Sequence, residues 1–194
     1  MGVWKGLIQS LVITPWLSAW EVIPAVVEEE PAEPEYVYGE NLITNSTFDV
    51  NLSGWTYTWG VADCTEVAPY EGAKSARLRR GGGAAMAMYS EIATEIGSVY
   101  EFTAYCKVGV QNDSTVVYLS AGEGHASNID SIGTTLVSDS QYETTYKQIT
   151  LVFTAVGEVT TISARHKDVI IDDVLGYESQ GFFDLMVCRK RTEG

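Results

Sequence analysis

The sequence predicts an all-β fold, an antiparallel β-sandwich of the jelly-roll type, preceded by an N-terminal arm that is helical or extended. Apolar and polar residues alternate over short segments, of which "YEFTAYCKV" (100–108) is the clearest. Such segments are bounded by Gly, Asn, Asp or Ser, the residues that favour turns. No stretch between residues 41 and 178 keeps a helical period. Many short strands separated by turns are typical of a sandwich or jelly roll.

Length and charge limit the classes of protein to consider. The chain has 194 residues, which is enough for one domain with tails, and its formal net charge is −14. Because such an acidic surface repels phosphate, nucleic acid is not an expected partner. The cysteines Cys64, Cys106 and Cys188 show no CxxC spacing, so neither a zinc site nor a disulfide framework is predicted. Buried free thiols are favoured over a disulfide between Cys64 and Cys106.

Residues 1–27 are apolar and contain three tryptophans, and three interpretations of them are open. A signal peptide or membrane anchor has weak support, because Lys5 is the single basic residue before the apolar stretch. A membrane span needs about 18 apolar residues, and Gln9, Ser10 and Pro15 interrupt this one. A local core helix is the second interpretation. The favoured one is an anchoring arm that docks into a partner protein, through an apolar face made of Val3, Trp4, Leu7, Ile8, Leu11 and Val12.

Two further segments flank the β region. Residues 28–40, "EEEPAEPEYVYGE", form an acidic linker whose prolines favour an extended backbone. Residues 179–194, "SQGFFDLMVCRKRTEG", form a last strand, a second docking segment or a solvated terminus. The predicted organisation is an arm (1–27), a linker (28–40), a β-sandwich (41–178) and a C-terminal tail (179–194).

The sequence contains no recognisable catalytic constellation. It has no GxSxG motif, no HExxH motif and no phosphate-binding glycine-rich loop. The run Gly81–Gly83 is not followed by GK[ST], so it is interpreted as a turn. His125 and His166 are isolated and are expected to pack or to lie at the surface. We therefore expect no enzymatic activity.

The segment "VIIDDVLGYE" (169–178) places two adjacent carboxylates in an apolar run that resembles a buried strand. Side chains alternate along a strand, so one of Asp172 and Asp173 is expected to face inward. A buried carboxylate is costly without a partner. Two partners are open, a bound cation or neighbouring backbone amides.

Four motifs in order resemble the CenC-type carbohydrate-binding modules of families 4, 9 and 22. They are "NLITNSTFDVNLSGW", "YEGAKSARL", "GSVYEFTAYCKV" and "VIIDDVLGYE", and together they span residues 41–178. The resemblance implies a jelly roll whose first and last strands meet beside a structural Ca²⁺. Carried over to this sequence, it implies carboxylate ligands from Asp49 and Asp172. Backbone carbonyls near Thr47 and in the turn around Glu71 and Lys74 complete the expected oxygen shell.

The same resemblance implies glycan binding by side chains on a face away from the core. Aromatic rings stack on sugars, and Arg donates paired hydrogen bonds to hydroxyl or carboxylate oxygens. Trp59 and Tyr57 in "WTYTWG" are the first candidates, while Trp55 is assigned to the core by analogy. The other candidates are Tyr105, Arg77, Arg79, Tyr118 and Arg165.

The favoured function is that of a non-catalytic structural or display protein of a bacteriophage particle. In this hypothesis residues 1–27 bind other virion proteins, and the jelly roll is exposed on the virion surface as an adhesin for host glycans. A secreted or surface-anchored bacterial carbohydrate-binding protein, located outside the cell, is the first alternative. A cement or connector protein that binds no sugar is the second.

Overall fold

The structure is a computed structural model that describes residues 34–58, 60–67, 69–80, 85–109, 115–123, 135–137, 143–168 and 180–194. The described residues belong almost entirely to one compact unit, Glu35–Gly194. The predicted arm, the first part of the linker, Trp59, His125 and the segment 169–178 with Asp172 and Asp173 lie outside the described residues.

Every regular element in the described part of the chain is a strand, which confirms the predicted fold class. The strands are β1 (Tyr36–Tyr38), β2 (Thr56–Thr58), β3 (Gly60–Thr65), β4 (Ser75–Arg80), β5 (Ala85–Ala93), β6 (Val99–Val108), β7 (Thr115–Glu123), β8 (Thr135–Val137), β9 (Lys147–Thr154), β10 (Val159–Asp168) and β11 (Gln180–Glu193).

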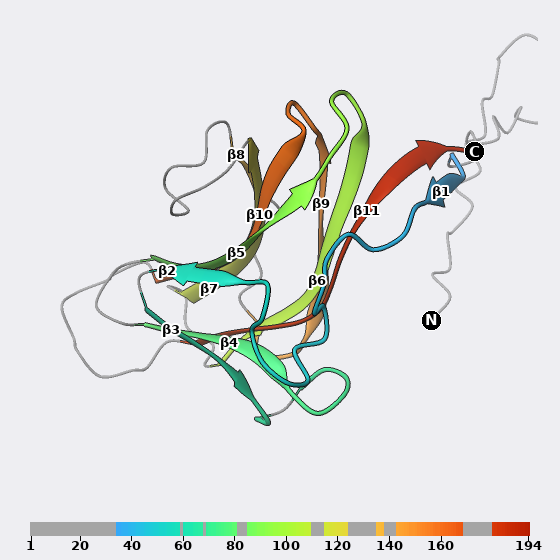
Figure 1. Ribbon diagram of the computed structural model, residues 1–194. Coiled ribbons are helices and arrows are strands. Elements are labelled where there is room, and N and C mark those ends of the chain that lie inside the picture. The colour runs from blue at the N-terminus through green and yellow to red at the C-terminus, as the bar shows by residue number, and fades with distance from the viewer. Residues whose placement is uncertain are drawn as a thin grey trace, which may run out of the picture. The chain divides into compact units, whose positions relative to one another are not determined.

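The strands form two antiparallel sheets (Figure 1). Sheet A has the order β3-β4-β11-β6-β9, and β1 pairs with the end of β11. Sheet B has the order β2-β5-β10-β7-β8. Because sequence neighbours such as β4 and β5 lie in different sheets, the chain crosses repeatedly from one layer to the other. Each functional face is therefore assembled from strands that are distant in sequence.

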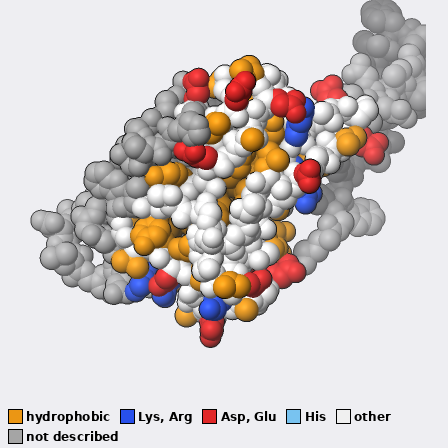
Figure 2. Space-filling view, viewed as in Figure 1, with side chains coloured by type: hydrophobic (Ala, Val, Ile, Leu, Met, Phe, Trp, Pro, Cys, Tyr) orange, Lys and Arg blue, Asp and Glu red, His pale blue; other side chains and the backbone are white. Residues whose placement is uncertain are grey.

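The surface has the acidic character that the composition predicts. Figure 2 shows Asp and Glu side chains scattered over the face seen in that view, whereas Lys and Arg side chains gather in a few small groups. Among the described residues, no helix is long and apolar enough to cross a membrane.

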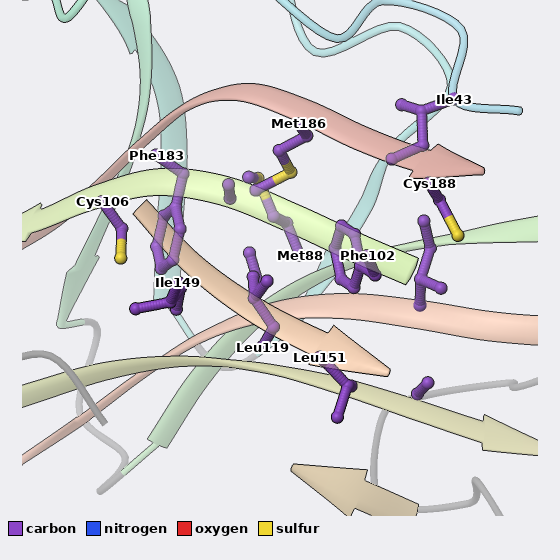
Figure 3. Close-up of a cluster of buried hydrophobic side chains, with 14 of the residues drawn as sticks. Ile43, Met88, Phe102, Cys106, Leu119, Ile149, Leu151, Phe183, Met186 and Cys188 are labelled. Carbon is purple, nitrogen blue, oxygen red and sulfur yellow. The ribbon is translucent and has the colours of Figure 1, made fainter. Parts of the chain in front are cut away.

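Alternation along the strands builds the core between the two sheets. In β6, Tyr100, Phe102, Ala104, Cys106 and Val108 are all buried, as their period of two predicts. They meet side chains from β9, β11 and sheet B in one hydrophobic cluster. Figure 3 shows part of this cluster, with Phe102, Phe183, Leu119 and Met88 directed toward one another from both sheets. Burying a side chain of this size stabilises a fold by about 1.5–3 kcal/mol.

The C-terminal segment is the central strand of sheet A. β11 lies between β4 and β6, so of the three interpretations of residues 179–194 the last strand is the one found. An irregularity between Asp184 and Val187 shifts its register against β6, and Leu185 has a positive φ of 45°. The sandwich reaches from Tyr36 to Glu193, further at both ends than the predicted 41–178.

The three cysteines are free thiols, as predicted. Cys106 and Cys188 are buried in the core, while Cys64 is half-buried. Burial in this apolar surrounding raises the pKa of both Cys106 and Cys188 to about 12. These two thiols are therefore packing residues.

Candidate functional site

The outer face of sheet B carries a row of small hydroxyl side chains. Met88, Leu119 and Ala164 are paired across β5, β7 and β10 and belong to the core. The next residues along these strands point the other way, because side chains alternate. Ser163 of β10 is thus paired with Ser120 of β7 on the face turned away from the core.

These hydroxyl groups are buried although they lie outside the core cluster. Ser120, Ser163 and Thr161 each have 0% exposure, and the Oγ atoms of Ser120 and Ser163 share a hydrogen bond. Thr161 is paired with Gly122, which adds no side chain. The middle strands β7 and β10 therefore carry small polar side chains on this face.

Larger side chains lie on either side of these buried hydroxyl groups. Arg165 and Tyr118 are paired at one end, with the guanidinium carbon 5.9 Å from the ring centroid. Tyr89 is paired with Ser163 from the β5 side and is 5% exposed, outside the core cluster. Glu91 is exposed and is paired with Thr161 at the other end. The half-buried Tyr118 ring and Arg165 guanidinium and the exposed Glu91 carboxylate are of the kinds that contact sugars.

The outer face of sheet A carries an ion cluster. Arg77 donates from Nε and Nη2 to the two carboxylate oxygens of Asp63 at 2.9 and 2.8 Å. Arg79 donates to Asp63 Oδ2 at 2.9 Å. The hydrogen bond from Arg77 is the largest cause that lowers the pKa of Asp63, even though partial burial opposes it.

A second acidic group joins the beginning and the end of the sandwich. The carboxylate of Asp184 in β11 has 0% exposure and accepts hydrogen bonds from the backbone N–H groups of Tyr70, Glu71 and Leu185 at 3.0, 3.2 and 2.9 Å. Burial raises the pKa of Asp184 in spite of these bonds, and the charge of Asp49 adds to the rise. Backbone amides are thus the partners of this buried carboxylate.

Asp49 holds the other side of the same turn. It accepts hydrogen bonds from Ala73 N at 2.8 Å and Thr47 Oγ1 at 2.9 Å, and the first of these is the largest cause that lowers its pKa. Gly72 has a φ of +71°, and a Cβ there would lie 2.4 Å from Asp49 Oδ1. The turn therefore needs glycine for both conformation and space.

The comparisons with known proteins address the family directly. The family model described as "Carbohydrate binding domain" matches residues 40–164, which is more than half of the chain. The chain belongs to the carbohydrate-binding domain family. A comparison with curated protein sequences gives no match.

Solved structures support the fold of this carbohydrate-binding domain. It is similar to "Family 16 Carbohydrate Binding Module-2", with 19% identity and a TM-score of 0.57, over 76% of this chain and 99% of that one. It is also similar to the CBM22-1 xylan-binding domain of Paenibacillus barcinonensis Xyn10C. The identity is 14% and the TM-score 0.56, over 78% of this chain and 95% of that one. A third similar structure is that of the enzymatically active domain of bacteriophage CBA120 tailspike protein 4. The identity is 14% and the TM-score 0.56, over 77% of this chain and 21% of that one.

The residues predicted to bind glycan do not share one face of the carbohydrate-binding domain. Tyr118 and Arg165 lie on the outer face of sheet B, whereas Tyr105, Arg77 and Arg79 lie on the outer face of sheet A. Tyr57 is 52% exposed and is paired with Met88, so it projects from edge strand β2 on the core side. Trp55 is 7% exposed, and its ring centroid is 5.8 Å from that of Phe48, as expected for a core residue.

Sequence reasoning missed part of this arrangement. Tyr89, Glu91 and the hydroxyl row on sheet B were not expected, because serine and threonine in a strand give no signal by themselves. Asp184 was also missed, although "FFDLMV" has the pattern of one acid in an apolar run that drew attention to "VIIDDV". Asp184 accepts hydrogen bonds from the turn at Tyr70 and Glu71. From the sequence, Asp172 and not Asp184 is expected to lie beside this turn.

Proposed function

We propose that this carbohydrate-binding domain is a non-catalytic module that binds a glycan chain along the outer face of sheet B. The observation that carries the proposal is the pair of Tyr118 and Arg165, both half-buried, beside small hydroxyl side chains on the outer face of sheet B. The sugar rings contact the face of Tyr118, while Arg165 donates to sugar oxygens.

A quantitative binding assay on the full-length protein tests this proposal. Isothermal titration with a panel of neutral oligosaccharides, xylan fragments among them, identifies the ligand. Arg165→Met and Tyr118→Ala are each expected to weaken binding about tenfold, since a hydrogen bond from a charged donor contributes about 1.5–3 kcal/mol and an aromatic contact about 0.5–1.5 kcal/mol.

Tyr57→Ala is the matched control, because Tyr57 is an exposed tyrosine on the same sheet that faces the other way. Its affinity is expected to equal that of the wild type. Loss of binding in Tyr57→Ala with full binding in Arg165→Met contradicts the sheet B site and favours the "WTYTWG" segment. Failure of every glycan to bind favours the connector role without sugar.

We further propose that Asp49 and Asp184 hold a structural Ca²⁺. No group of three or more Asp, Glu, His or Cys side chains gathers among the described residues, so carbonyl oxygens would supply most of the shell. The two carboxylates fit the ion in chemistry, because they are hard oxygen donors and neither pairs with a Lys or Arg of the described part of the chain. Addition of Ca²⁺ to EDTA-treated protein is expected to raise Tm. An unchanged Tm contradicts the site.

The third part of the proposal concerns location. We infer that residues 1–27 attach the domain to a phage particle and that the sandwich is displayed on the outside of the virion. The apolar arm and the acidic linker in the sequence support this, and the fold also occurs within a phage tailspike protein. Immunogold labelling of purified particles tests it. Absence of label from particles, with the protein found in the medium of the producing bacterium, favours the secreted alternative.

A further inference from the structure

A small cavity opens on the outer face of sheet A, away from the glycan face proposed above. Its volume is about 210 Å³, and Phe182, Gln180, Val67, Thr144, Lys107 and Gly109 line it. A Cβ at Gly109 would lie 3.1 Å from Gln180 Cβ and 3.2 Å from Phe182 Cε2, so the missing side chain provides part of the space. The cavity has room for several waters or for a small polar molecule.

Lys107 brings an unpaired positive charge to this cavity. Its Nζ lies 4.6 Å from the Tyr146 ring centroid and 5.2 Å from the Phe182 ring centroid. No carboxylate of the described residues forms an ion pair with it. By contrast, Lys190 and Lys147 pair with Glu95 and Glu143. Ring faces weakly favour the ammonium group, but its three N–H donors have no anionic partner.

The neighbouring residues add to this positive charge. Phe182 is paired with Lys107 on one side and Arg77 on the other, and Gln180 is paired with Arg79. The paired positions therefore include three cations, Lys107, Arg77 and Arg79. They include one carboxylate, that of Asp63. The Nε atom of Arg79 is buried and has no hydrogen-bond partner. A local excess of cations in a chain of net charge −14 is consistent with an anion-binding role.

The lining also has parts that suit the rest of a sugar. Phe182 and Val67 offer apolar surface for the C–H groups of a ring, and the Gln180 amide and Thr144 hydroxyl can each donate and accept. A uronic acid residue presents apolar C–H groups, hydroxyls and one carboxylate. An acidic peptide side chain presents the carboxylate without the ring hydroxyls, so only the peptide backbone could bond to the Gln180 amide and Thr144 hydroxyl.

We propose that the cavity beside Phe182 binds the carboxylate-bearing ring of an acidic sugar, with the Lys107 ammonium group as the partner of the carboxylate. This inference rests on the proposed function for the statement that the ligand is a glycan. It adds a second subsite on the opposite sheet and selects uronate-containing polysaccharides as the ligand class.

Titration of the full-length protein with trigalacturonate tests the proposal, with a neutral trisaccharide and a glutamate-rich peptide as comparison probes. Lys107→Gln is expected to weaken trigalacturonate binding at least tenfold. The matched control is Lys190→Gln, which removes the same charge from an exposed lysine that is ion-paired with Glu95, and its affinity is expected to be unchanged. Binding is also expected to weaken as salt is added.

Amide chemical shifts of the wild-type protein give a measurement that needs no variant. With trigalacturonate, the signals of Gly109 and Thr144 are expected to move. Shifts confined to β5, β7 and β10, or uronate binding that survives Lys107→Gln and is lost in Arg165→Met, place the ligand on sheet B and overturn this inference while the proposed function stands. Tighter binding of the peptide than of the uronate overturns the sugar class, and absence of any uronate binding overturns the site.

Discussion

Removal of the Asp184 carboxylate is expected to destabilise the sandwich more than removal of a typical acidic side chain. Asp184→Ala leaves three backbone N–H groups, those of Tyr70, Glu71 and Leu185, without their acceptor. A buried donor without a partner costs about 1–3 kcal/mol, and the lower value applies because these bonds are only partly buried. Relief from burying a charge, seen in the raised pKa of Asp184, offsets part of this cost.

The net expectation is a loss of about 2–3 kcal/mol in the free energy of unfolding. For a chain of this size, that corresponds to a decrease in Tm of about 4–12 °C. Urea unfolding followed by tryptophan fluorescence measures the loss, and the experiment is done in EDTA so that no bound cation contributes. Asp184→Asn keeps one acceptor oxygen and is expected to lose only about 1 kcal/mol.

Asp49→Ala is the control for the carboxylate pair, because Asp49 is exposed and water can replace it as the acceptor for Ala73 N and Thr47 Oγ1. Its loss is expected to stay below about 1 kcal/mol. A free energy of unfolding for Asp184→Ala equal to that of the wild type refutes the view that these three backbone hydrogen bonds join the last strand to the turn.

Three further changes test other parts of the fold. The pKa of Asp63 is lowered in the folded state. The stability that this carboxylate contributes is therefore present above its unfolded pKa and is lost as pH falls through its folded pKa. The free energies of unfolding of wild type and Asp63→Asn should differ at neutral pH and converge in acid. Phe102→Ala is expected to lose about 3–5 kcal/mol in urea unfolding, whereas Val152→Ala, at an exposed position, should lose less than about 0.5 kcal/mol. Gly72→Ala combines a positive φ with a clash against a carboxylate, and its Tm should fall below that of Gly97→Ala, where φ is also positive but the space is open. Equal Tm values for these two glycine variants contradict the steric part of the argument.

The strand pattern was predictable because burial acts on each strand separately. Tyr100, Phe102 and Ala104 alternate with polar residues, and one buried face is enough to impose that period. The same alternation is present in β9, where Ile149, Leu151 and Phe153 are buried between exposed residues.

The candidate sites were less predictable because they depend on which strands become neighbours. Ser120 and Ser163 are 43 residues apart and meet only because β7 and β10 pair. Tyr105 and Tyr118 both alternate out of the core, but the sequence does not state that one lies on sheet A and the other on sheet B. Strand order, which is a property of the whole chain, decides which polar side chains share a face.

The pairing of β1 with the end of β11 has a mechanical consequence. Tyr36 is opposite Glu193 and Tyr38 is opposite Arg191 (Figure 1). Just before them, Glu35 O accepts a hydrogen bond from Gly194 N at 3.0 Å, so tension from the N-terminal side reaches this bond first. The Arg191 guanidinium, 4.0 Å from the Tyr36 ring, also holds β1 against β11. Detachment of the three residues of β1, at about 3.3 Å each, lengthens the extended segment before the sandwich by about 10 Å. β1 can therefore detach under tension before the pairing of β4, β11 and β6 in sheet A is disturbed.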